Sequence, residues 1–136
     1  DAAWVGLLTV QGLGGFLRAW ENQPLFASQA RLPEDVLADQ RARRLRHRPE
    51  GLALALRVLG LGEMLPPALG RARPPLRLLV GGEDTKFLAL AGWIEKRAPN
   101  ATVQIIPGRG HNLLLEAPTA VAAALAASLS SRGEAR

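Results

Sequence analysis

The chain has 136 residues and a formal net charge of +5, with 48% hydrophobic residues and no cysteine. This length fits one domain, and the apolar content is high enough for a packed core. The lack of cysteine excludes disulfides, thiolate metal sites and a cysteine nucleophile. We find no signal-peptide pattern and no apolar run of the roughly 20 residues that cross a bilayer, so we expect a soluble, cytoplasmic protein.

The first half of the chain lacks any convincing strand pattern and predicts helices. Apolar residues at helical spacing place the first helix over roughly Ala2–Glu21. Gly12, Gly14 and Gly15 weaken its middle, which predicts a break there, and Pro24 ends the segment.

A second helix is expected to begin at Pro33, with acidic residues in its first turn and arginines in its last turns. Leu37, Arg41, Arg44 and Arg48 follow the spacing i, i+4, i+7, i+11 and therefore share one helix face. An inward-facing arginine needs an acidic partner, because an isolated buried cation is very costly. This pattern favours a ligand for Arg41 and Arg44.

The same helix belongs to a run of five arginines between positions 41 and 48. Such a run can bind nucleic acid, a membrane surface or a small acidic ligand, or it can be a solvated helix face. Arg43 and Arg46 are expected to point outward as solvated charge. Residues 49–51 predict a turn, residues 52–59 a short helix, and residues 60–75, rich in Gly and Pro, a connector.

From residue 76 onward the pattern changes to strand, helix, strand, helix, which is typical of a parallel α/β sheet. The strands are expected over Leu76–Val80 and Val103–Ile106, and Pro118 opens the last helix. The apolar face of the helix between the strands is expected to carry Phe87, Leu90, Ala91 and Ile94, and that of the last helix Val121, Leu125 and Leu129. Two buried parallel strands are too few for a sheet, so further strands are expected beside them.

Asp84 and His111 each follow one of these strands, in the loops Gly81-Gly82-Glu83-Asp84 and Gly108-Arg109-Gly110-His111. The carboxyl ends of parallel strands are where open α/β sheets build their sites. A carboxylate beside a histidine fixes the ring tautomer and stabilises the imidazolium that forms when the ring takes a proton. Either residue alone suits a turn, but the pair in this order predicts catalysis.

Three sequence words extend this pattern into a resemblance. They are Phe16-Leu17-x-x-Trp20-x-x-Gln23-Pro24-Leu25-Phe26, Gly82-Glu83-Asp84-x-Lys86-Phe87 and Gly110-His111-Asn112-x-x-x-Glu116-x-Pro118. Together they resemble the MenH-type α/β-hydrolases, the 2-succinyl-6-hydroxy-2,4-cyclohexadiene-1-carboxylate synthases. The resemblance implies an α/β fold that comprises the C-terminal portion of an α/β-hydrolase. Residues 1–70 would form the helical cap, and residues 71–136 the last two parallel strands with their flanking helices.

The resemblance implies a lyase of menaquinone biosynthesis, which eliminates pyruvate from a cyclohexene carboxylate through a Ser-His-Asp triad. His111 would be the general base that activates the serine, and Asp84 its orienting partner. Trp20 and a cap arginine would contact the carboxylated substrate; Arg44 aligns best, with Arg41 and Arg46 as alternatives. Lys86 would add to the positive charge that attracts the substrate carboxylates, or form a salt bridge with Glu83 or Glu116. Without the resemblance, Trp20 reads as a core residue, as do Trp4 and Trp93.

The nucleophile is the main departure from the family pattern. No G-x-S-x-G word occurs in this chain, and its serines have no strand-turn-helix context. We therefore expect the N-terminal half of the same enzyme as partner, and no activity from this chain alone. We also expect neither metal nor cofactor, because the chain has only two histidines, no cysteine and no G-x-x-x-x-G-K-[ST] phosphate loop. Alternatives are an esterase or carbon–carbon hydrolase of the same fold, a non-catalytic basic binding module and an inactive fragment. We expect no nucleic acid or membrane partner, and the sequence does not indicate the oligomeric state.

Overall fold

The computed structural model describes residues 1–60 and 75–133, which fall into two compact units. Among the described residues, the first unit comprises residues 1–24 and 31–60, and the second residues 25–30 and 75–133. The predicted connector lies almost entirely outside the described residues. Each unit is considered by itself.

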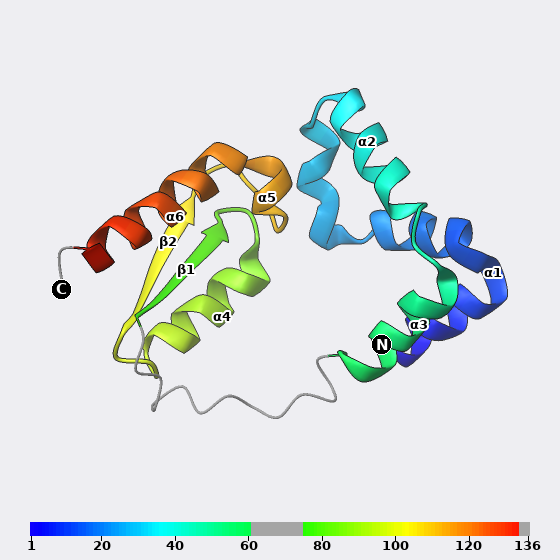
Figure 1. The fold of residues 1–136 in the computed structure, drawn as a ribbon, viewed down its shortest axis with the longest axis horizontal. Helices are drawn as coiled ribbons and strands as arrows, with labels where there is room; N and C mark the ends of the chain where they lie inside the picture. The colour runs from blue at the N-terminus through cyan, green and yellow to red at the C-terminus, as the bar shows by residue number, and fades with distance from the viewer. Residues whose placement is uncertain (61–74, 134–136) are drawn as a thin grey trace. The chain divides into compact units, whose positions relative to one another are not determined.

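The first unit is helical and contains α1 (Ala2–Glu21), α2 (Glu34–Arg44) and α3 (Pro49–Val58) (Figure 1). Its core consists of Leu8, Phe16 and Leu17, against which apolar side chains of α1 and α3 pack. The predicted break in α1 occurs at Gly12, whose φ of 64° and ψ of −175° lie outside the helical region. This conformation is open essentially to glycine alone, which explains why the break falls at this residue.

The ends of two elements in this region differ from expectation. α2 ends at Arg44, so Arg48 is not on its face and instead precedes α3 as an exposed residue. Residues 49–51 form the first turn of α3 rather than a separate turn, because the fixed φ of proline suits the first helical position. Between α1 and α2 the structure also has a 3-10 helix, η1 (Pro24–Arg31), that the sequence pattern did not predict.

The second unit contains the predicted parallel strands β1 (Leu76–Gly81) and β2 (Ala101–Ile106), paired in register from Leu76 opposite Ala101 to Gly81 opposite Ile106. α4 (Thr85–Glu95) connects the strands, and α6 (Pro118–Gly133) lies on the opposite side of the strand pair (Figure 1). Helices on both faces are typical of parallel sheets. A one-turn helix, α5 (Leu113–Glu116), precedes α6.

Several residues of the predicted apolar faces of this unit are exposed. Leu90 on α4 is 42% exposed, and Leu125 and Leu129 on α6 are 61% and 70% exposed, whereas the smaller Ala91 and Ala124 are buried. Helical periodicity identifies an apolar face but not how much of it is covered. Trp93 was also predicted as core and is 47% exposed, with the Arg97 guanidinium 4.2 Å from its ring centroid.

Candidate active site

The loops that follow β1 and β2 lie side by side because backbone hydrogen bonds join them. The N–H of Gly82 donates to the carbonyl of Ile106 over 2.8 Å, and the N–H of Glu83 donates to that of Arg109 over 2.9 Å. A side chain at Gly81 would clash with the carbonyl oxygens of Arg109 and Gly110, so glycine permits this close approach. The two loops carry Asp84 and His111.

Asp84 and His111 are in direct contact, as the sequence predicted. Oδ2 of Asp84 lies 2.7 Å from Nδ1 of His111, while Oδ1 of Asp84 accepts the Phe87 N–H over 3.1 Å and caps α4. The Asp84 side chain is 4% exposed and that of His111 29% exposed. The carboxylate is thus fixed from two sides, while part of the imidazole remains accessible to a reacting group.

Two phenylalanines pack near the imidazole. The ring centroid of Phe87 lies 4.4 Å and that of Phe26 6.0 Å from the centroid of the His111 ring. Both residues belong to the words that carry the resemblance, but no contact with His111 was predicted for them. Their contacts restrict the ring orientation that the hydrogen bond to Asp84 selects.

His111 also borders a hollow of about 400 Å³ between β1, α5 and α6. Its lining includes Arg77, Leu79, Leu113, Leu114, Val121 and Leu125. A largely apolar hollow with a histidine at its edge is typical of a site that binds an organic molecule or packs against further protein.

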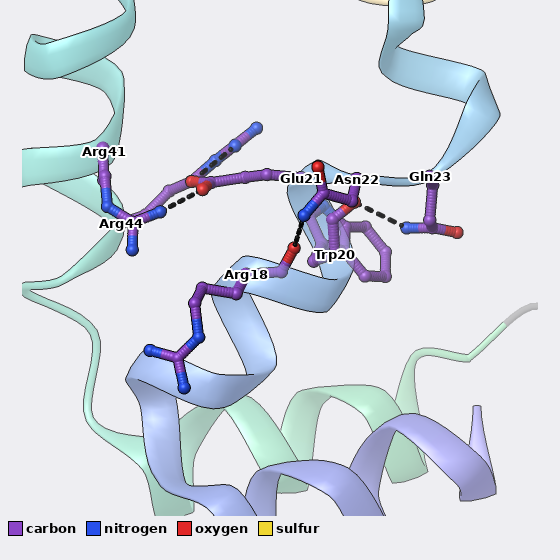
Figure 2. Close-up of polar contacts among 7 residues, drawn as sticks. All are labelled: Arg18, Trp20, Glu21, Asn22, Gln23, Arg41 and Arg44. Atoms are coloured by element: carbon purple, nitrogen blue, oxygen red, sulfur yellow. Dashed lines mark hydrogen bonds and ion pairs between the residues drawn. The ribbon is translucent and has the colours of Figure 1, made fainter.

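The first unit supplies the acidic partner that the inward-facing arginines require. The carboxylate of Glu21 accepts Nη1 of Arg41 through one oxygen and Nη1 of Arg44, at 3.2 Å, through the other (Figure 2). The sequence analysis did not predict this role of Glu21. The only sequence signal for it was its position next to Trp20, at the end of the first helix. Two guanidinium groups share one carboxylate, so one positive charge of this cluster remains unneutralised.

The rest of the arginine run is not a uniform basic surface. Nε of Arg43 lies 2.9 Å from the Asp39 carboxylate, one helical turn away, and its side chain is 68% exposed as predicted. Three of the five arginines are therefore ion-paired within the chain, and Arg46 and Arg48 are exposed. This pairing weakens the field that nucleic acid binding would use.

Trp20 packs against the core of the first unit and is partly buried. Its ring centroid lies 5.6 Å from that of Phe16, nearly parallel, and 5.1 Å from that of Trp4, nearly edge-on. The side chains of Asn22 and Gln23 donate to the carbonyls of Arg18 and Trp20, over 2.8 and 3.1 Å, and so cap the end of α1 (Figure 2). Trp4, which was predicted as a core residue, is partly buried and packs against this core.

Lys86 is exposed, and its ammonium lies 5.7 Å from the Phe87 ring centroid. Glu116, one of its predicted alternative partners, instead accepts backbone N–H groups. Among the described residues there is no group of three or more His, Cys, Asp or Glu side chains that could hold a metal ion. In the same part of the chain, no helix has the length and apolar character that a membrane span requires.

Residues 1–124 match the Alpha/beta hydrolase family. A protein of Bacillus subtilis (strain 168), provisionally named a 2-succinyl-6-hydroxy-2,4-cyclohexadiene-1-carboxylate synthase, is 38% identical over 110 residues, covering 79% of this chain and 40% of its own. The synthase of that name from Serratia proteamaculans (strain 568) is 33% identical over 129 residues, which cover 92% of this chain and 47% of the length of the synthase.

A solved structure, MenH from S. aureus, matches with a TM-score of 0.90 and 30% sequence identity, covering 95% of this chain and 49% of that one. The chain therefore resembles MenH in both sequence and structure, and it spans about half the length of the relatives it matches.

Proposed function

The chain belongs to the α/β-hydrolase family, and on this premise we propose that it forms the C-terminal part of a MenH-type lyase that eliminates pyruvate from a cyclohexene carboxylate in menaquinone biosynthesis. The contact of 2.7 Å between Asp84 and His111 carries the proposal. Residues 1–70 would be the cap, and residues 71–136 the end of the catalytic core.

His111 acts as the general base. Asp84 accepts the Nδ1–H, which leaves the lone pair of Nε2 free to take a proton from a serine hydroxyl. The serine oxygen then removes a proton from a substrate carbon, the electron pair of the broken C–H bond forms a C=C bond in the ring, and the C–O bond to the leaving group breaks. The departing enolate takes the proton held by the His111 imidazolium and becomes pyruvate. Asp84 stabilises the imidazolium that exists during this step.

The serine would come from the N-terminal half of the enzyme. This chain has no G-x-S-x-G word, and it spans about half of each relative. The exposed apolar residues of α6 and the hollow beside His111 favour further protein packed on the two-stranded sheet. The chain alone would accordingly lack activity.

Substrate carboxylates would bind to the cap arginines. Arg41 and Arg44 carry one positive charge more than Glu21 neutralises, which suits an additional carboxylate. Trp20 would contribute the part of its ring that the core leaves uncovered, and Lys86 would add to the positive field near Asp84.

The test combines this chain with the N-terminal part of the Bacillus subtilis relative, either co-expressed or fused, and measures pyruvate in a coupled assay with the MenH substrate. We expect pyruvate release that His111→Ala and removal of the partner's serine each abolish. The intact Bacillus protein is the positive control, and the same split made within it shows whether the halves assemble. Turnover of simple esters without pyruvate release would replace the lyase with an esterase, and pyruvate release by the chain alone would refute the need for a partner.

A further inference from the structure

Glu116 is a buried carboxylate that the proposed reaction does not use. It is 5% exposed and closes the one-turn helix α5, five residues after His111. A buried carboxylate needs compensating hydrogen bonds, since an unsatisfied charge in a low-dielectric site is very costly. The partners of Glu116 therefore indicate what it does.

Both carboxylate oxygens of Glu116 accept backbone N–H groups that flank the histidine. Oε2 accepts the N–H of Gly110 over 2.7 Å, and Oε1 accepts that of Asn112 over 3.2 Å. The residues on either side of His111 are thus held by one side chain. Such bonds to a charged acceptor are stronger than those between neutral groups.

Gly110 allows this arrangement. A Cβ atom there would lie 3.3 Å from Oε1 of Glu116 and would clash with the side chain of Ser28. The short bond from the Gly110 N–H therefore depends on a residue without a side chain.

We propose that Glu116 is a positioning residue, which fixes the backbone on both sides of His111 and so directs Nδ1 of the ring to Asp84. The proposal concerns His111 as the base, and in that respect it rests on the proposed function. Asp84 acts on the ring directly, whereas Glu116 acts through the backbone. Loss of either should disturb the tautomer of His111, but only loss of Glu116 should release the two amides.

The chain offers a direct test, because His47 and His111 are its only histidines. In the uniformly ¹⁵N-labelled full chain, at a pH where both rings are neutral, we expect the proton of the His111 ring on Nδ1 and slow hydrogen exchange at the Gly110 and Asn112 amides. In Glu116→Gln the single amide oxygen can accept only one of the two N–H groups, so at least one of the two amides should exchange about tenfold faster or more, as expected for a lost buried hydrogen bond. The Nδ1–H fraction of His111 should also fall, while exposed His47 stays unchanged.

Two variants separate this effect from general loosening. Glu95→Gln is the matched control, because the Glu95 carboxylate also accepts a backbone N–H, that of Val103, over 3.2 Å, but at an exposed position. It should leave His111 unchanged. Asp84→Asn should alter the tautomer and leave the exchange of the two amides slow. Protected amides in β1 and β2 show that each variant is folded.

Unchanged exchange and tautomer in a folded Glu116→Gln chain would overturn the proposal, as would fast exchange of both amides in the unsubstituted chain. If Glu116→Gln is unfolded, Glu116→Ala and Glu116→Asp are compared by the same measurement, and loss of β1 and β2 protection in all three would assign Glu116 to folding instead. These readouts need no activity, so they stand or fall apart from the lyase assignment. In an active combined enzyme, Glu116→Gln should lower kcat and leave KM unchanged.

Discussion

Asp84 binds His111 with one carboxylate oxygen and caps the following helix with the other. Oδ2 lies 2.7 Å from Nδ1 of His111, and Oδ1 accepts the N–H of Phe87. The same residue therefore serves the imidazole and the start of α4, and the two roles respond differently to substitution.

Asp84→Asn is expected to retain the N-terminal cap of α4 and to lose the support of His111 as the general base. The asparagine oxygen can still accept the Phe87 N–H, but its amide group cannot accept the Nδ1–H of His111 with the second position. We expect kcat of the combined enzyme to fall by about 10⁴-fold, with stability nearly unchanged. Asp84→Ala should lose the cap as well, at a cost of about 1 kcal/mol in the free energy of unfolding. Equal stability of the two variants in urea titrations would contradict the capping role.

Arg41 and Arg44 are expected to set the affinity for the carboxylated substrate. Arg41→Ala and Arg44→Ala should each raise KM about tenfold or more, as expected for a lost charge-assisted hydrogen bond. Arg43→Ala is the control, because Arg43 is exposed and pairs with Asp39. An effect confined to Arg46→Ala would assign the substrate contact to Arg46. An equal effect of Arg43→Ala would mean that these arginines act only through a general positive field.

Gly81 is expected to tolerate no side chain. An added Cβ would clash with the carbonyls of Arg109 and Gly110, so Gly81→Ala must displace the loop that carries His111. We expect a loss of about 1–3 kcal/mol in the free energy of unfolding. Gly92→Ala is the matched control: Gly92 lies within α4, a Cβ there meets no atom within 4 Å, and the change should stabilise the chain by about 1 kcal/mol. Similar melting temperatures for both variants would contradict the close approach of the loops.

Gly12 is expected to be needed for the break in α1. Its φ of 64° is unfavourable for any residue with a Cβ, although there is space for one. Gly12→Ala should destabilise the first unit by about 1–3 kcal/mol, and Gly6→Ala in the same helix, also with free space, should stabilise it by up to about 1 kcal/mol. A gain in helix content and stability for Gly12→Ala in circular dichroism would show that the break is dispensable.

The local elements were largely predictable because they depend on residues close in sequence. Apolar patterning placed α1 and both strands, and the low helix propensity of three nearby glycines predicted a break in the middle of α1, which the structure has at Gly12. Element ends were less predictable, because Pro49 fits both a turn and the first turn of a helix. Coverage of an apolar face was not predictable, since Trp93 and Leu125 differ from buried residues only in what lies next to them.

The sequence by itself determined that Asp84 and His111 follow neighbouring parallel strands, and this order brings the two side chains together. Only the tertiary structure decided which distant acids hold the rest: Glu21 binds Arg41 and Arg44, and Glu116 binds the backbone beside His111. The physical reason is that strand order follows from local pattern and chain connectivity, whereas the choice of a hydrogen-bond acceptor depends on side-chain distances that no spacing along the chain encodes.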